Sequence, residues 1–224
     1  MKQLIIILDV GGYTERLRAL QAAHPHVIGI TPHDHPCDGF TPIQVPDEWL
    51  STDPAMDYAK KCWHGTGTLG LAAIQQLGLQ ADAFWFIESD CVAPTERWQA
   101  MIADHAENPT DAIFLCPRTR AETLWNHWWT HPGTPAWCDI THLNAIYRLT
   151  RRAVDAYADA AQECRECFGE MVIGSVVKRA GFTLGRINTA TTHMNTQTMK
   201  ADPTRVLLNR RLVNHPVKSN TFAP

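Results

Sequence analysis

The stretch Phe84-Trp85-Phe86-Ile87-Glu88-Ser89-Asp90 decides the fold class of this chain. Its four apolar residues have the length and composition of a strand that is buried on both faces, as in the middle of a parallel sheet. Two acids follow at once, and Pro94 then opens a helical pattern over 95–107. The stretch therefore delivers carboxylates to the carboxyl end of a central strand, where α/β proteins bind their ligands.

Shorter apolar runs on either side extend this pattern. Residues 4–10 are rich in β-branched side chains and stop at Gly11-Gly12, which predicts a first buried strand. The other expected strands are 27–31, 112–117, 140–149 and 182–187. The expected helices are 14–23, 95–107, 150–164 and 168–180, together with helix over 55–77 on both sides of an interruption at Gly65-Thr66-Gly67. We therefore predict an α/β fold with a central, mostly parallel mixed sheet flanked by helices on both faces.

Residues 32–54 break the pattern with five prolines and several Asp and His residues. Irregular loops of this length are uncommon in compact domains unless they are functional. We expect an irregular surface loop that serves as a lid or as one wall of a ligand site.

Composition and charge exclude several classes of protein. The chain has 224 residues, of which 45% are hydrophobic and 19% charged, so it is long and apolar enough for one globular domain and is not a disordered chain. Its formal net charge of -3 argues against nucleic-acid binding by bulk charge, although it leaves a local basic patch open.

The sequence also favours a cytoplasmic location. No apolar run approaches the roughly 18 residues that a membrane helix needs, and the N-terminus lacks a signal-peptide pattern. Seven cysteines, an odd number, indicate reduced thiols without structural disulfides.

Glu88 and Asp90 are the strongest candidates for a metal site. Strand-end carboxylates two residues apart can face one crevice, and Mg²⁺ or Mn²⁺ is held by one or two such groups while water and substrate phosphates complete the shell. The alternative is that Asp90 caps the following helix and Glu88 is solvated.

With this motif the chain resembles nucleotide-sugar glycosyltransferases of the GT-A fold, whose Asp-x-Asp or Glu-x-Asp motif also follows a central strand. The resemblance extends to residues 4–10 as the first nucleotide-binding strand and to Trp85–Trp98, the strand, motif and Trp-bearing helix of poorly characterised bacterial and phage members. It implies transfer of a sugar from a nucleotide diphosphate sugar, most often a UDP-sugar, to an acceptor hydroxyl. Asp90 is then the direct metal ligand, and Glu88 supports the metal and contacts the donor.

The resemblance also implies a donor pocket. In this fold the end of the first strand faces the nucleotide base and ribose, so Asp9, Val10 and Gly11 are expected to line it, together with Ser89 of the acidic motif. The glycine pair forms no dinucleotide-binding or P-loop motif, which weakens dehydrogenase and P-loop interpretations.

His215 and Lys218 carry a second point of resemblance. Retaining GT-A enzymes have a C-terminal His that completes the metal shell and a nearby Lys that binds the diphosphate. An imidazole in the shell would favour Mn²⁺ over Mg²⁺. The Gly-x-x-Lys-Pro-Trp continuation of those enzymes is absent, so retention or inversion stays open, and His193 is the competing ligand.

Glu170 is the candidate general base. Many inverting GT-A enzymes place a catalytic acid at the start of a late helix, where it takes the proton from the acceptor hydroxyl. Asp139 is the alternative base, and a retaining reaction needs neither. A purely structural explanation for Glu170 is its favourable position near a helix N-terminus.

We expect one domain, residues 1–224, in three parts. Residues 1–110 form the nucleotide-sugar half, 111–187 the acceptor half, and 188–224 a tail that closes the site. The aromatic cluster Trp125, Trp128 and Trp129, with His127 and His131, either stacks on an acceptor or packs in the core. The acceptor itself, a glycan, a small molecule or a modified DNA base, is not identified.

Two other function classes are compatible with the same residues. A metal-dependent hydrolase or nucleotidyltransferase could use the strand-end acids. A non-catalytic sugar- or nucleic-acid-binding module could use the Trp cluster with Arg205, Arg210, Arg211 and Lys218. A zinc site in residues 33–38 and a redox role for Cys164-x-x-Cys167 have weaker support, because neither has the expected second half or context.

Overall fold

The computed structural model of the chain describes residues 1–9, 14–65, 67–122, 134–187, 194–195 and 213–214. The first half comprises β1 (Gln3–Leu8), α1 (Thr14–Ala23), β2 (Val27–Pro32), β3 (Thr41–Ile43), the 3₁₀ turn η1 (Asp47–Trp49), α2 (Tyr58–His64), α3 (Gly67–Gln76), β4 (Ala83–Glu88) and α4 (Thr95–Asp104). The second half comprises β5 (Ala112–Thr119), η2 (Arg120–Glu122), β6 (Ile140–Thr150), α5 (Arg151–Ala160), α6 (Gly169–Arg179), β7 (Leu184–Arg186), β8 (Met194–Asn195) and β9 (Val213–Asn214).

The main sheet has seven strands in the order β3-β2-β1-β4-β6-β5-β7. All pairs are parallel except those of β6, which runs antiparallel to both β4 and β5. Leu8 of β1 pairs with Glu88 of β4, and Ile87 pairs with Ile146 of β6. The predicted α/β class, with a mostly parallel mixed sheet between helices, is confirmed.

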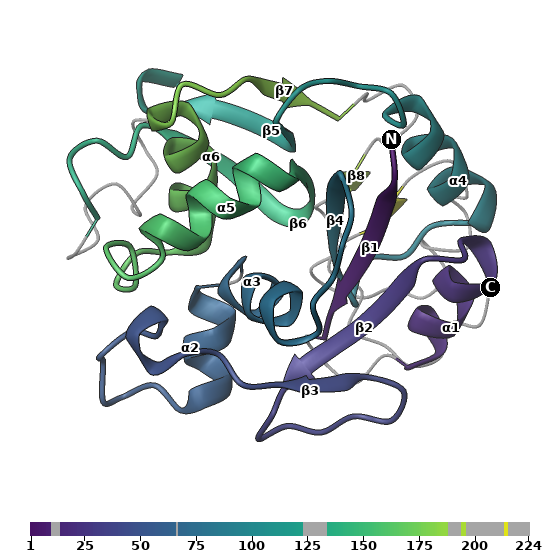
Figure 1. The fold of residues 1–224 in the computed structure, drawn as a ribbon, viewed down its shortest axis with the longest axis horizontal. Helices are drawn as coiled ribbons and strands as arrows, with labels where there is room; N and C mark the ends of the chain where they lie inside the picture. The colour runs from purple at the N-terminus through teal and green to yellow at the C-terminus, as the bar shows by residue number, and fades with distance from the viewer. Residues whose placement is uncertain (10–13, 66, 123–133, 188–193, 196–212, 215–224) are drawn as a thin grey trace.

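The side chains of the central strands build a separate core on each face of the sheet. Figure 1 shows α3, α5 and α6 on one side and α1 and α4 on the other. Phe84 and Phe86 of β4 pack into the first of these cores, and Trp85 and Ile87 pack into the second. Because successive strand residues point to opposite faces, the continuous apolar run at 84–87 supplies both cores.

The segment 32–54 differs from the irregular loop that we predicted. It contains β3, which pairs in parallel with β2 through Ile30 and Thr41, and the turn η1. Pro42 lies in this strand and is tolerated there because β3 is at the edge of the sheet, where one side of the backbone needs no partner. Proline content alone therefore misled the sequence interpretation.

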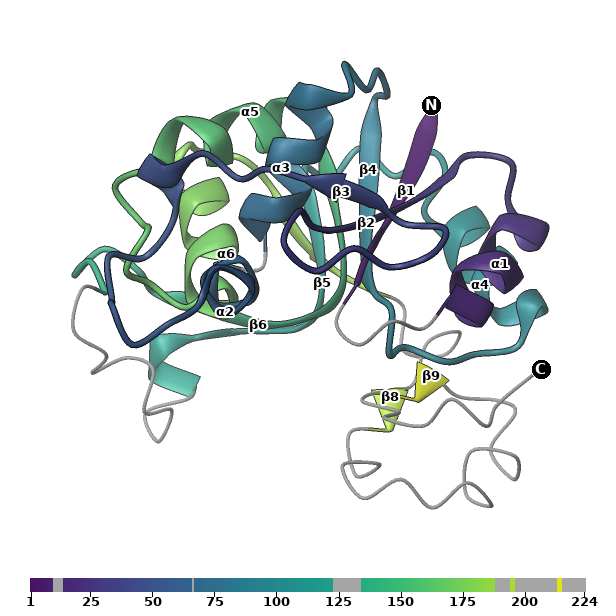
Figure 2. The same cartoon turned by 90° about the horizontal axis from the view of Figure 1, so that it is seen from below.

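The end of the chain contains a second, smaller sheet within the described residues. Met194 and Asn195 pair in parallel with Val213 and Asn214. Figure 2 shows these two strands set apart from the seven-stranded sheet.

Asp111 stabilises the edge of the sheet that β5 and β7 form. Its buried carboxylate accepts hydrogen bonds from the guanidinium of Arg152, the backbone N–H of Thr183 at 2.9 Å and the hydroxyls of Thr183 at 2.8 Å and Thr150 at 3.1 Å. Burial alone would raise the pKa of Asp111, but the hydrogen bonds from Arg152 and Thr183 outweigh it and lower the pKa to about 2. The carboxylate thus joins the starts of β5 and α5 to the segment before β7.

Replacing Asp111 with Ala is expected to destabilise the fold by about 2–4 kcal/mol at neutral pH, because three polar partners lose a buried acceptor. The folded pKa lies below the unfolded one, so this stabilisation is complete above about pH 4 and is lost as the pH falls toward 2. Urea denaturation of both proteins at pH 7 and pH 3 measures it. An equal difference at the two pH values would contradict the assignment.

Candidate active site

The candidate site begins where β1 and β4 end side by side. The Ser89 N–H donates to the Leu8 carbonyl at 2.8 Å, which continues the ladder one residue beyond β4. The Ser89 hydroxyl then donates to Asp9 at 3.3 Å, and the hydroxyl of Thr31, in β2, donates to the other Asp9 oxygen at 3.3 Å. The structure therefore brings the predicted donor-pocket residue Asp9 into contact with the acidic motif.

Both acids of the motif are buried at this edge, with exposed fractions of 8% for Glu88 and 1% for Asp90. Charged carboxylates are costly to bury unless a cation or hydrogen bonds compensate them. Arg16 of α1 is also buried, and its guanidinium donates to the Ser89 carbonyl at 3.2 Å. Asp9, Glu88 and Asp90 thus bring three acidic side chains to this edge, and Arg16 brings a buried positive charge to the same motif.

The pKa of the Cys91 thiol is shifted by burial and by the charged groups of this edge. Burial raises the pKa of its thiol, the negative charges of Asp90 and Glu88 raise it further, and Arg16 opposes the shift. The four groups therefore lie within electrostatic range of one another.

Arg16 was missed in the sequence analysis. Its signal was its position four residues before Leu20, which places both side chains on the buried face of α1. An arginine on an apolar helix face needs an acceptor to contact, and the Ser89 carbonyl of the acidic motif provides one.

Replacing Arg16 with Met is expected to lower the free energy of unfolding by about 3 kcal/mol, because the buried acids lose their cation. Addition of Mn²⁺ should then raise the melting temperature of the variant more than that of the wild type. The matched control is Arg18→Met on the same helix, whose side chain is 61% exposed and should matter little. Equal effects of the two substitutions would refute this role for Arg16.

The acids at this edge fit a hard divalent cation. They present carboxylate oxygens with excess negative charge, which is the donor chemistry that Mg²⁺ and Mn²⁺ prefer. No three His, Cys, Asp or Glu side chains of the described residues form a complete metal-binding group. A bound ion would thus need oxygens from a substrate diphosphate, water or residues beyond the described part of the chain.

The other half of the site is built by β6 and α6. The Cys91 thiol donates to the Ala145 carbonyl at 3.4 Å, so the residue after Asp90 contacts β6. One residue earlier, the Asn144 N–H donates to the Glu170 carboxylate at 3.3 Å. A chain of contacts therefore connects the acidic motif to the candidate base at the start of α6.

The irregular pairing of β6 leaves this N–H available to Glu170. The ladder between β5 and β6 shifts register between the pairs Phe114–Tyr147 and Leu115–Leu143, so the intervening residues of β6 have no partners in β5. Bulges of this kind are common beside active sites, where they re-aim the backbone and side chains.

Asp139, the alternative candidate base, lies near the end of α6, whereas Glu170 lies at its start. It precedes β6, five residues before Asn144, which is roughly 16 Å along an extended strand. Its carboxylate pairs with Lys178 in the last turn of α6, and its backbone N–H donates to Ser175 at 3.0 Å. Of the two candidate bases, Glu170 therefore contacts Asn144, the neighbour of the residue that Cys91 contacts, whereas Asp139 pairs with Lys178.

Several predicted site residues lie outside the described residues: Val10, Gly11, His193, His215, Lys218 and the cluster Trp125, Trp128 and Trp129 with His127 and His131. Their predicted roles stay predictions.

The structure also describes the two weaker candidates, the metal site in residues 33–38 and the redox pair Cys164 and Cys167. In residues 33–38, the His33 ring packs edge-on against the Tyr58 ring, with 4.4 Å between the ring centroids. No metal-binding group forms among the described residues. Cys164 and Cys167 are buried thiols that follow α5 and form no disulfide. Neither segment gains support as a functional centre.

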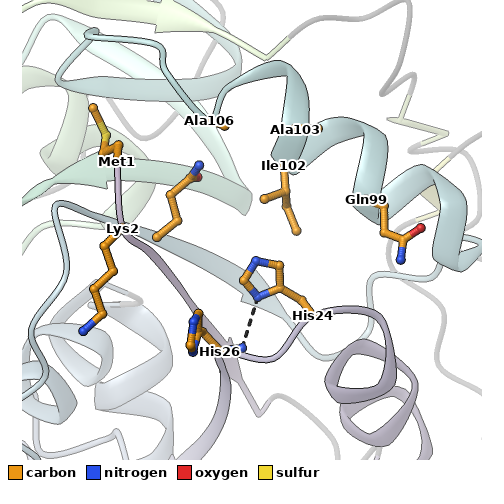
Figure 3. A pocket seen from close by; sticks show the side chains of 9 residues that line it. Met1, Lys2, His24, His26, Gln99, Ile102, Ala103 and Ala106 are labelled. Carbon is orange, nitrogen blue, oxygen red and sulfur yellow. Dashed lines mark hydrogen bonds between the residues drawn. The ribbon is translucent and has the colours of Figure 1, made fainter.

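A pocket of about 400 Å³ lies at the opposite, amino edge of the sheet (Figure 3). It lies between the start of β1, at Lys2, the two imidazoles of His24 and His26, and α4, at Gln99. No acid is among the described residues that line it. Because the acidic motif lies at the other edge, this pocket is not part of the candidate active site.

No protein-family model and no curated protein matches the sequence. Among solved structures, mouse xyloside xylosyltransferase 1 in its apo form aligns with a TM-score of 0.51 at 8% identity, over 99% of this chain and 100% of that one. A glycosyltransferase involved in glycosylation of the major capsid of PBCV-1 aligns with a TM-score of 0.49 at 12% identity, over 97% and 95% of the two chains.

Glucosyl-3-phosphoglycerate synthase from Mycobacterium tuberculosis, solved with Mn²⁺, UDP and glucosyl-3-phosphoglycerate, aligns with a TM-score of 0.47 at 12% identity, over 84% and 70% of the two chains. Identities this low are evidence of a shared fold and not of a shared substrate. None of the helices within the described residues has the length and apolar character to cross a bilayer. The strand order, the antiparallel β6 and the xylosyltransferase alignment together show that this chain has a GT-A-type fold.

Proposed function

We propose that this protein is a metal-dependent glycosyltransferase that moves a sugar from a nucleotide diphosphate sugar to an acceptor hydroxyl. The observation that carries the proposal is the negatively charged edge where Glu88, Ser89 and Asp90 meet Asp9. Such an edge suits a divalent cation together with a diphosphate, because the cation compensates the buried carboxylates and the phosphates at once. A UDP-sugar is the proposed donor, on the resemblance of the motif to that family.

Each residue of the site has a proposed task. Asp90 and Glu88 would hold Mn²⁺ or Mg²⁺, which supplies charge neutralisation for the departing diphosphate. Asp9 and Ser89 would face the donor ribose, together with Val10 and Gly11. His215 would complete the metal shell, and Lys218 would bind the diphosphate.

Glu170 is the proposed general base of an inverting reaction. The Asn144 N–H orients its carboxylate, and the first turn of a helix favours the charged form. A carboxylate held in this way can accept the proton of an acceptor hydroxyl as the new glycosidic bond forms. Asp139 stays the alternative, although its pairing with Lys178 must first be broken.

Calorimetric titration of the wild-type protein with UDP and GDP, with and without Mn²⁺, tests the proposal. We expect nucleotide binding that requires the metal. Binding of neither nucleotide under either condition would refute the transferase assignment. Incubation with UDP-sugars then separates the rival enzyme classes, because release of free sugar or of pyrophosphate without transfer would identify a hydrolase or a nucleotidyltransferase.

A further inference from the structure

His142 and Asn144 are two buried polar side chains for which the reaction described above has no use. They lie two residues apart on β6, with exposed fractions of 3% and 2%. Neither ring nitrogen of His142 and neither polar atom of the Asn144 amide makes a hydrogen bond within the described part of the chain. Buried polar groups of native proteins nearly always have partners, so two neighbouring exceptions require an explanation.

Contacts on either side place this pair beneath the first turns of α6. The Ser175 hydroxyl accepts from the Ile140 N–H at 2.9 Å, and Glu170 accepts from the Asn144 N–H at 3.3 Å. The helix therefore runs antiparallel to this part of β6, with its N-terminus over Asn144. Gly174 lies between these contacts, and a Cβ atom there would come within 3.5 Å of His142 Nδ1. The imidazole thus lies in the layer between β6 and α6, on the side that leads to Glu170.

The surroundings of the pair are apolar or negatively charged. The Phe114 ring packs on the His142 imidazole with 4.0 Å between centroids. Burial lowers the pKa of His142 to about 3 against an opposing contribution from the nearby Asn144 amide, so the ring is neutral at physiological pH. Glu88 is close enough to add to the rise in the pKa of the Tyr147 hydroxyl, which burial causes first, and Tyr147 lies on the same strand. A ligand here would meet neutral hydrogen-bonding groups with carboxylates on both sides.

A neutral imidazole and a primary amide each offer a donor and an acceptor. Hydroxyl groups also donate and accept, so they complement this pair, whereas phosphate or carboxylate groups only accept and would be repelled by Glu88 and Glu170. We propose that His142 and Asn144 bind hydroxyl groups of a neutral, polyhydroxylated acceptor and thereby select it over an anionic one. This inference rests on the proposed function and names the acceptor class for the same site.

Saturation-transfer NMR measures this binding without turnover. The probes are the methyl glycosides of glucose, galactose and xylose, and the corresponding sugar phosphates, each added to protein with UDP and Mn²⁺. We expect saturation of at least one methyl glycoside and of none of the sugar phosphates. Saturation of the sugar phosphates alone, or of no glycoside, would overturn the proposal.

Two variants and one control assign the binding to these side chains. Asn144→Ala and His142→Phe should each weaken glycoside binding about tenfold, because the ligand loses a buried partner. The control is His105→Phe, since His105 is also a buried histidine but lies at the end of α4. Unchanged binding in both site variants would show that the pair holds internal water or has a packing role only, and would also overturn the proposal.

The two proposals fail in different ways. Metal-dependent UDP binding without glycoside binding would reject the acceptor assignment and leave the transferase assignment intact. Absence of UDP binding would reject the transferase assignment first. Thermal melting of each variant shows whether it is folded, and if Asn144→Ala does not fold, Asn144→Ser takes its place in the same titration.

Discussion

Replacing Asp90 with Asn is expected to abolish Mn²⁺-dependent nucleotide binding and to lower kcat by about 10³-fold or more. Asn keeps the shape of Asp but removes the charge that a divalent ion requires. Loss of the metal would remove several kcal/mol of transition-state stabilisation from the departing diphosphate, which corresponds to that loss of rate. Calorimetry with UDP and Mn²⁺ measures the binding, and release of UDP from a UDP-sugar measures the rate.

The fold of this variant should survive. Asp90 is 1% exposed and lies among other acids, so removing one negative charge relieves repulsion and offsets the lost contacts. Asp57→Asn is a suitable control. Asp57 is a half-exposed acid just before α2, and it pairs with Lys60 inside that helix. If Asp90→Asn binds UDP and Mn²⁺ as the wild type does, Asp90 is not the metal ligand.

Glu170→Gln is expected to lower kcat by about 10²–10⁴-fold and to leave metal-dependent UDP binding unchanged. The Gln carbonyl can still accept the Asn144 N–H, so the local structure is kept, but the amide cannot take a proton. This separation of rate from donor binding distinguishes Glu170 from Asp90, whose loss should affect both.

Asp139→Asn, assayed in parallel, decides between the two candidate bases. Asp139 pairs with Lys178 away from Glu170, so its substitution should change kcat less than threefold, a difference below about 1 kcal/mol. If Asp139→Asn loses the activity and Glu170→Gln keeps it, the assignment is reversed. Full activity in both variants would indicate a reaction without a protein base, as in a retaining mechanism.

Much of the fold could be predicted from local patterns. The run at 84–87 is apolar at every position, which only a strand buried on both faces explains, and α1 and α3 follow from their helical spacing. The positions of Glu88 and Asp90 at the end of that strand follow directly. The edge strand β3 could not be predicted in this way, because its pairing with β2 depends on a partner rather than on its own three residues.

The candidate site was predicted only in part. Asp9, Glu88, Ser89 and Asp90 are each marked by the end of a strand, and the register of β1 with β4 brings them together. Arg16 is marked only by its place on the apolar face of α1, and His142 and Asn144 lie inside β6, where no break in the pattern marks them. Their importance comes from what they contact across the sheet, and such contacts have no signature in the sequence.

The sequence by itself determined most of the helices and the central strands, the α/β class and the strand end that carries the acids, because these depend on residues that are close along the chain. The tertiary structure decided that β6 runs antiparallel, that α6 begins over Asn144 and that Glu170 contacts Asn144 while Asp139 pairs with Lys178. These facts depend on packing between segments up to 80 residues apart, as in the contact of Ser89 with Asp9. Such packing is chosen by the free energy of the whole core, which no local pattern records.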